Sequence, residues 1–272
     1  MGLFAIFTRL KKFDNIINKL GAKKGVYMLD FVLNFLFPPV CGICGKINEN
    51  WLCTRCRDRL KNIEKSYYIY EKEKILKLFN IELKNVNIKL SRNKFCGRNE
   101  IYFDEFFYYF EYKSLTRKLL LKYKFSDASY LSNLFANVIL NNKKTYEIFE
   151  NYDIMFPVPM DKKKELNRGY NQTELITKII EKYINKKTNI NLKIDNNSLI
   201  KIKLTKTQST LNAKERTQNI ENAFKLKNNI VKNKRIIIFD DICTTGATVN
   251  EISRILKIAG AKKILVLVIA KD

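Results

Sequence analysis

The chain has 272 residues, of which 46% are hydrophobic and 12% aromatic, so it can bury a core and is not disordered throughout. Its formal net charge of +24 suggests polyanionic partners such as nucleic acid, nucleotides or anionic lipid, although lysines spread over solvated faces explain the charge equally well. The sequence contains no histidine, which excludes Ser–His and Cys–His catalysis and any histidine-bound metal.

Residues 1–35 predict an N-terminal helical segment, not an export signal or a membrane span. The apolar stretch at 26–37 is short, and Asp30 and Asn34 interrupt it. We therefore expect a cytoplasmic protein without a transmembrane segment. The first 13 residues could also lie on a membrane as a basic amphipathic helix, but packing against the rest of the chain is the favoured interpretation.

Residues 36–62 contain a C-x2-C-x8-C-x2-C array, formed by Cys41, Cys44, Cys53 and Cys56. Each C-x2-C pair can bend around one ion, and four thiolates form the tetrahedral cage that Zn²⁺ favours. Disulfides are the alternative, which a chain without an export signal disfavours. Because four protein ligands leave no open position for a substrate, we expect a structural Zn²⁺ in a small ribbon module.

Residues 63–103 are rich in Lys, Asn and Tyr and predict only a connector with some helix. From residue 104 the pattern becomes that of an α/β domain. An aromatic run precedes a helical repeat of apolar residues at 115–123, and a second amphipathic segment follows at 130–140. A basic helix beside aromatic residues could stack nucleic-acid bases, but a helix that covers a sheet is the favoured interpretation.

A buried strand is predicted at 154–156, followed by Pro157 and Val158. The stretch LNRGYNQ, which contains Arg168, then leads into a helix with apolar residues between 175 and 180. A strand, a proline-rich loop, a cationic turn and a helix form the layout of a binding loop in an α/β sheet. The polar segment at 204–224 suits a mobile flap or an exposed hairpin, with a plain surface loop as the alternative.

The stretch RIIIFDDICTTGAT at 235–248 begins as a strand buried on both faces. An amphipathic helix follows at 249–259, Gly260 is its expected stop, and KKILVLVIA predicts another central strand. This order places the sequence DDICTTGAT at the carboxyl end of a strand and the start of a helix. Ligands bind at that position in open α/β sheets.

The residue types in this loop point to a phosphorylated sugar. A helix start offers unpaired N–H groups to a phosphate, and Gly246 permits close approach of the backbone. Threonine hydroxyls add donors, and the loop contains no Lys, so it is not a triphosphate-binding loop of the Walker type. Asp240 and Asp241 would repel that phosphate but suit a vicinal diol. A phosphate beside a diol describes a ribose 5-phosphate.

The segment IIIFDDICTTGAT resembles the phosphoribosyl-pyrophosphate (PRPP) motif of type I phosphoribosyltransferases. With the four-cysteine ribbon, EYKSLTRKLLLKYKFSD, VPMDKKKELNRGYNQ and TKTQSTLNAKERTQNIENAF, the chain is similar from about residue 36 onward to the ComF family of competence-associated proteins. The resemblance implies a type I phosphoribosyltransferase fold, an α/β fold with a five-stranded, mostly parallel sheet flanked by helices and a hood. We expect this domain at 104–272, after the helical segment (1–35), the zinc ribbon (36–62) and the connector (63–103).

The resemblance also implies roles for individual residues. Asp240 and Asp241 would hold the ribose hydroxyls, and the 5-phosphate would meet the loop residues Cys243, Thr244, Thr245, Gly246, Ala247 and Thr248. Pro157, Val158 and Arg168 would contact the pyrophosphate, and Thr207, Gln208 and Arg216 would belong to a closing flap. Mg²⁺ would arrive bound to PRPP. Asp240, Asp241 and Arg168 are therefore the candidate catalytic residues.

Two functions remain open from the sequence. The first is an enzyme that transfers a phosphoribosyl group from PRPP to an unidentified nitrogenous acceptor. The alternative is a non-enzymatic protein of DNA uptake that binds nucleotides or single-stranded DNA, with the ribbon docking on proteins of the competence machinery. Arg55, Arg57 and Arg59 beside the second cysteine pair could contact phosphates or form a solvated face. The sequence specifies neither the acceptor base nor the oligomeric state.

Overall fold

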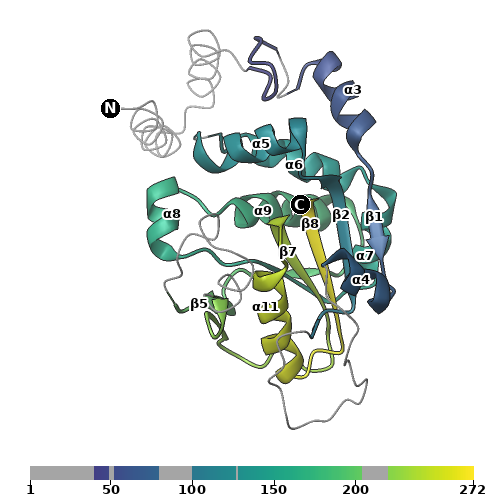
Figure 1. Cartoon of the computed structure of the whole chain (residues 1–272), viewed down its shortest axis with the longest axis vertical. Helices are drawn as coiled ribbons and strands as arrows, with labels where there is room; N and C mark the ends of the chain where they lie inside the picture. The colour runs from purple at the N-terminus through teal and green to yellow at the C-terminus, as the bar shows by residue number, and fades with distance from the viewer. Residues whose placement is uncertain (1–39, 49–51, 80–99, 127, 204–219) are drawn as a thin grey trace.

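The centre of the molecule is a six-stranded sheet with the strand order β1-β2-β8-β7-β3-β4. The structure is a computed structural model that describes residues 40–48, 52–79, 100–126, 128–203 and 220–272 (Figure 1). Five strands are parallel to one another, and β1 joins the β2 edge antiparallel. The strands are β1 (Tyr67–Ile69), β2 (Glu105–Glu111), β3 (Ile154–Pro157), β4 (Lys193–Ile194), β7 (Arg235–Cys243) and β8 (Lys263–Lys271).

The central strands are buried on both faces, which is why their sequences are continuously apolar. In β7 and β8, successive side chains belong to two different core clusters, one on each side of the sheet. The first face is covered by α5 (Ser114–Phe125), α6 (Leu131–Leu140), α7 (Lys143–Glu150) and α9 (Gln172–Lys187). The second is covered by α4 (Lys72–Leu78), α11 (Ala247–Ile258) and a hairpin of β5 (Leu199–Lys201) and β6 (Phe224–Leu226).

The cysteine ribbon packs on the first face instead of standing apart from the domain. Cys41, Cys56 and Leu60 belong to the same core cluster as the buried residues of α5. The Lys122 ammonium on α5 donates to the carbonyl of Gly42 in the first cysteine pair (3.3 Å). Helix α3 (Thr54–Ile63) starts at the second cysteine pair and leads into β1 (Figure 1). The ribbon is therefore tied both to a covering helix and to an edge of the sheet.

The predicted strands at 154–156 and 235–239, the C-terminal strand and the helix ended by Gly260 are confirmed. The aromatic run at 105–111, for which the sequence predicted no strand, forms β2. The connector prediction for 63–103 was incomplete, because this range also supplies β1 and so extends the sheet to six strands. The turn expected around Arg168 is largely a short helix, α8 (Lys162–Arg168).

Some predictions cannot be placed. The N-terminal helical segment at 1–35 lies outside the described residues. The described ends of the polar segment at 204–224 lead into the paired strands β5 and β6, as a hairpin requires, while 204–219 lie outside the described residues. No helix within the described ranges combines the length and apolar character that crossing a membrane needs.

Candidate functional site

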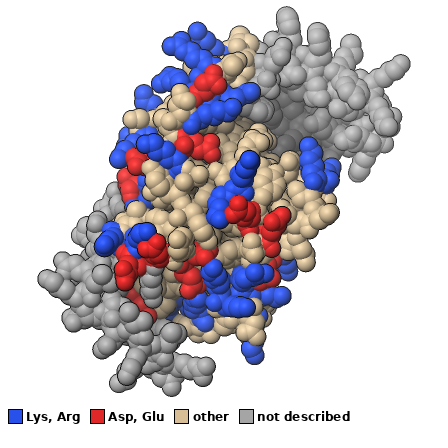
Figure 2. Space-filling model, turned by 90° about the vertical axis from the view of Figure 1, so that its right-hand side faces the viewer, with Lys and Arg blue, Asp and Glu red and all other residues tan. Residues whose placement is uncertain are grey.

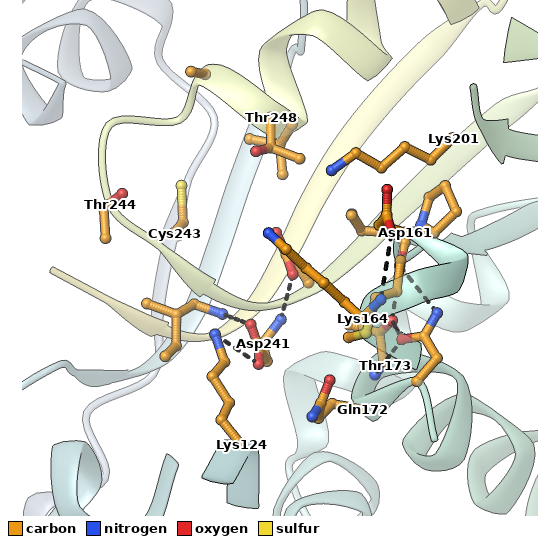
Figure 3. A pocket seen from close by; sticks show the side chains of 18 of the residues that line it. Lys124, Asp161, Lys164, Gln172, Thr173, Lys201, Asp241, Cys243, Thr244 and Thr248 are labelled. Carbon is orange, nitrogen blue, oxygen red and sulfur yellow. Dashed lines mark hydrogen bonds and ion pairs between the residues drawn. The ribbon is translucent and has the colours of Figure 1, made fainter. Parts of the chain in front are cut away.

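A cavity of about 450 Å³ lies at the carboxyl ends of β3 and β7 (Figure 3). Its walls come from the loop between β7 and α11, the start of α9, helix α8, the last turn of α5 and the β5–β6 hairpin. The carboxyl ends of neighbouring parallel strands meet at one edge of a sheet, where the loops leave a crevice for ligands. A cavity therefore lies at the strand ends where the sequence predicted a ligand site.

The loop at the end of β7 leads through a glycine into the start of helix α11. Strand β7 ends at Cys243, and α11 begins at Ala247 with Gly246 as its N-cap at φ +76°. A Cβ atom on Gly246 would lie 2.8 Å from Cε1 of Phe79, so a glycine is needed for space as well as for conformation. The first residues of α11 and the loop threonines line the cavity, and a helix start offers unpaired N–H groups to an anion.

The adjacent carboxylates of β7 are held by different partners. Oδ1 of Asp240 accepts the backbone N–H of Asp241 (2.8 Å), and Oδ1 of Asp241 accepts that of Ile242 (2.7 Å). Oδ2 of Asp241 lies 3.0 Å from the ammonium of Lys124, on the last turn of α5. Figure 3 shows this ion pair at the floor of the cavity.

The two carboxylates differ in their electrostatic environment, because Asp240 has a raised pKa and Asp241 is paired with a cation. Burial raises the pKa of Asp240 to about 8, and repulsion from Asp241 adds to the increase, while Lys124 and the Asp241 N–H partly oppose it. The Lys124 ammonium directly neutralises Asp241, which is almost entirely buried. The site therefore contains one carboxylate that readily holds a proton and one that is paired with a cation.

Cations gather on the wall formed by α8 and the hairpin. Lys164 and Arg168 come from α8 and Lys201 from β5, and Figure 3 shows Lys164 and Lys201 extending into the cavity. Burial lowers the pKa of Lys201, and the nearby Lys164 lowers it further. Asp161 begins α8 by accepting the N–H groups of Lys163 and Lys164. Two ammonium groups that face one cavity favour an anionic ligand.

The start of α9 is anchored to α5 beside the cavity. The buried Tyr123 hydroxyl donates to the carbonyl of Gln172 (2.8 Å), and the Tyr170 hydroxyl donates to the carbonyl of Tyr123 (2.7 Å). Oγ1 of Thr173 donates to the carbonyl of Val158 after β3 (3.0 Å). These bonds fix the position of the binding loop relative to Lys124.

The structure brings together most of the predicted site residues. Those that line the cavity are Val158, Arg168, Asp240, Asp241, Cys243, Thr244, Thr245, Gly246, Ala247 and Thr248. Pro157 is the last residue of β3, one position before the lining begins. The Arg168 guanidinium donates to Gln172 (3.1 Å) and lies over the Phe125 ring at 5.1 Å. Thr207, Gln208 and Arg216 lie outside the described residues.

Three cavity lysines were missed from the sequence, namely Lys124, Lys164 and Lys201. Each belongs to a segment with many lysines, and nothing local distinguishes the one that faces the cavity. For Lys124 there was a weak signal: it is in the last turn of an amphipathic helix that precedes the binding elements.

The four ribbon cysteines form a second site, of metal-binding type. Their sulfur atoms lie within 4.8 Å of one another. Burial raises the pKa of the Cys41 thiol, but backbone N–H groups of the ribbon outweigh it and bring the pKa to about 6. Burial raises the pKa of Cys56 to about 12, and hydrogen bonds and charge repulsion from the neighbouring cysteines add to the increase. A bound divalent cation would lower this pKa, because it favours the thiolate. The sulfur cluster thus fits Zn²⁺, which a four-thiolate cage would hold for a structural purpose.

Comparison with known proteins agrees with both sites. The family model "Phosphoribosyl transferase domain" matches residues 171–272, and "Double zinc ribbon domain" matches residues 32–67. Fold, cavity and cysteine cluster together define a phosphoribosyltransferase-like domain joined to a zinc ribbon.

Among curated relatives, the chain is 30% identical to Competence protein F of Haemophilus influenzae, over 54% of this chain and 64% of the relative. It is 28% identical to Competence protein ComFC of Streptococcus pneumoniae (57% and 63%) and 30% identical to the DNA utilization protein YhgH of Escherichia coli (51% and 58%). These relatives and the two family models together support a protein of the ComF family. The matches span about three fifths of these relatives' length.

A solved hypoxanthine phosphoribosyltransferase from Staphylococcus aureus is 13% identical over 54% of this chain and 64% of its own, with a TM-score of 0.30. At that score the likeness adds nothing to the fold assignment, which rests on the sheet and the family model.

Proposed function

We propose that the protein binds PRPP, or a nucleoside monophosphate, and transfers the phosphoribosyl group to a nitrogenous acceptor. The observation that carries the proposal is the cavity at the end of β7, where the start of helix α11 adjoins two carboxylates. Lys164, Arg168 and Lys201 on the opposite wall supply the positive charge that a pyrophosphate needs. A ribose 5-phosphate with a pyrophosphate at C1 matches these three features in one molecule.

The chain's residues would act by positioning and by electrostatics. The loop from Thr244 to Thr248 would hold the 5-phosphate, and Asp240 and Asp241 would accept the ribose hydroxyls. The bond from C1 to the pyrophosphate oxygen breaks with its electron pair on the leaving group, the acceptor nitrogen forms the new bond to C1 with its lone pair, and that nitrogen releases its proton to solvent. Cations on the α8 wall would stabilise the departing charge. Mg²⁺ bound to PRPP would neutralise further charge of the pyrophosphate.

Ligand-induced stabilisation tests the proposal. Mg²⁺–PRPP at about 100 times its dissociation constant should stabilise the protein by roughly 2.7 kcal/mol. Replacing both carboxylates, Asp240→Asn with Asp241→Asn, should abolish this stabilisation and leave the fold intact. An equal response of the double variant would contradict the assignment of the carboxylates. A screen of nucleobases for pyrophosphate release then tests turnover and identifies the acceptor.

A non-enzymatic role in DNA uptake is the second candidate. The names of the relatives favour it, as do Arg55, Arg57 and Arg59, which are exposed on α3. Figure 2 views the side on which α3 and β1 lie and shows Lys and Arg both at the end near α3 and at the opposite end, with acidic groups among them. In this role single-stranded DNA would lie along the end near α3, the ribbon would be the docking site for competence proteins, and the protein would act in the cytoplasm.

Salt dependence separates the two candidates. If single-stranded DNA is a partner, affinity for an oligonucleotide should fall steeply with salt, because each neutralised phosphate releases counterions. Reversing Arg55, Arg57 and Arg59 to Glu should weaken the complex while PRPP still stabilises the protein. Fluorescence anisotropy at three salt concentrations measures this. Equal DNA binding by the reversed variant would exclude α3 as the DNA-binding surface. PRPP turnover without DNA binding would leave the enzymatic function as the one that stands.

A further inference from the structure

Lys124 reaches the candidate site from a helix that the sequence did not connect with it. Its ammonium lies 3.0 Å from Oδ2 of Asp241, and the two side chains are only 22% and 8% exposed. The other oxygen of Asp241 accepts the N–H of Ile242. Each oxygen of this carboxylate therefore has a protein donor that holds it in place.

The neighbours of Lys124 hold its helix in place. Tyr123 is fully buried and bonds to the start of α9, and Lys122 bonds to the first cysteine pair of the ribbon. The last turn of α5 is thus attached on both sides, although a lysine side chain by itself is flexible. An ammonium on an anchored turn can fix the carboxylate that it pairs with.

The charge of Lys124 also acts on the neighbouring carboxylate. Asp240 is next to Asp241 on β7, and the attraction of Lys124 opposes the burial and repulsion that raise the pKa of Asp240. An opposite charge within about 4–6 Å shifts a carboxyl pKa by roughly 1–3 units. Without the ammonium, the pair of aspartates would hold its proton to a higher pH.

We propose that Lys124 is a positioning residue, whose ion pair fixes the orientation of the Asp241 carboxylate so that Asp240 and Asp241 can accept the hydroxyls of a bound ribose 5-phosphate. The inference rests on the proposed function, because the ligand is the one proposed there. It assigns Lys124 a role through Asp241, without a contact of its own with the ligand.

Other titratable groups face the two aspartates and remain in every variant. From the elements around the cavity these are Tyr112, Tyr123, Asp161, Lys164, Arg168, Lys201, Cys243 and Asp272. Because they are unchanged, a difference in pH dependence between variants reports on Lys124 itself.

The test measures the dissociation constant of Mg²⁺–PRPP by calorimetry between pH 6 and pH 9. The midpoint is the pH at which the affinity for Mg²⁺–PRPP is half lost through protonation of the two aspartates. Below this midpoint, Lys124→Met should weaken binding about tenfold for each unit by which it raises the pKa of the pair. The midpoint itself should move upward. Lys124→Arg should restore both affinity and midpoint. Lys118→Met, an exposed lysine on the same helix, is the matched control and should bind like the wild type.

Two further variants separate positioning from other roles. In an Asp241→Asn background, Lys124→Met should cost less affinity than in the wild type, because only the effect of its charge on Asp240 remains. An equal loss in both backgrounds would show that Lys124 contacts the ligand and would overturn the proposal. Lys124→Gln keeps a hydrogen-bond donor without the charge, so it should retain more affinity than Lys124→Met but show the raised midpoint. It also replaces Lys124→Met if that variant does not fold.

The outcomes distinguish this inference from the proposed function. If wild-type protein does not bind Mg²⁺–PRPP, the proposed function fails. If it binds, and Lys124→Met or Lys124→Gln binds with the same affinity and the same pH midpoint, the role of Lys124 is overturned while the proposed function stands.

Discussion

The contact between Phe79 and Gly246 predicts how the loop between β7 and α11 responds to a single added methyl group. Gly246 has φ +76°, and an added Cβ would lie 2.8 Å and 3.0 Å from two ring atoms of Phe79. Gly260 has φ +89°, but its Cβ would meet only Lys232, at 3.5 Å or more. Gly246→Ala and Gly260→Ala therefore introduce similar backbone strain, and only the first also introduces a clash.

The expected magnitudes follow from these contacts. A non-glycine residue in the left-handed region costs about 1–2 kcal/mol, and both variants should lose this much. The clash adds the displacement of Phe79, whose ring packs edge-on against Phe103 at 5.9 Å and Phe106 at 5.3 Å. Each aromatic pair contributes about 0.5–1.5 kcal/mol, so Gly246→Ala should cost about 1–3 kcal/mol more than Gly260→Ala.

Urea unfolding followed by circular dichroism measures both losses, provided that the slope with denaturant is unchanged. In a Phe79→Ala background the clash is absent, and Gly246→Ala should then cost no more than Gly260→Ala. Equal losses for the two glycine variants in the wild-type background would refute the reasoning, as would an excess for Gly246→Ala that persists without the Phe79 ring.

Three other measurements test the zinc site, the core and the carboxylates. Purified protein should contain about one Zn²⁺ per chain, and Cys53→Ser should lower the metal content and the melting temperature; a metal-free preparation with an unchanged melting curve would contradict the zinc assignment. Tyr109→Phe should cost about 1–3 kcal/mol in urea unfolding, because the hydroxyl of Tyr109 lies 2.7 Å from that of Thr145 and both residues are buried. The pKa of Asp240 is raised in the folded state to about 8, so between about pH 4 and pH 8 the folded protein holds a proton that the unfolded chain has released. Stability should fall as the pH rises through this window, and Asp240→Asn should remove that part of the slope.

The parts of the fold that the sequence predicted are those with a local signal. The strand that ends in Asp240 and Asp241 is continuously apolar, and the glycine and threonines after it mark a loop and a helix start. The cysteine spacing predicted the ribbon because ligand spacing along the chain reflects geometry around one ion. In both cases the residues that act together are neighbours in sequence.

The parts that were missed depend on contacts between distant segments. Strand β2 is buried on both faces, so its aromatic residues show no alternation that would distinguish a strand from a helix. Strand β1 has only three residues, and its place in the sheet depends on pairing with β2. Lys124 and Asp241 are more than 100 positions apart, and only the fold brings them within 3.0 Å. Such pairs leave no trace in the local pattern of one sequence.

Strand β1 lies at the edge of the sheet, on the far side of β2 from the strands that carry the cavity. A shortened chain that begins at residue 104 would retain all five parallel strands, yet it would expose the backbone edge of β2 at Phe106 to Tyr108. A bare edge of such apolar sequence is a template for pairing with another chain. By pairing with β2, strand β1 covers this edge and so removes a surface on which two chains could pair. Helix α3 connects the second cysteine pair directly to β1. Loss of zinc should therefore loosen β1 from the sheet and cause aggregation, in addition to making the ribbon less stable.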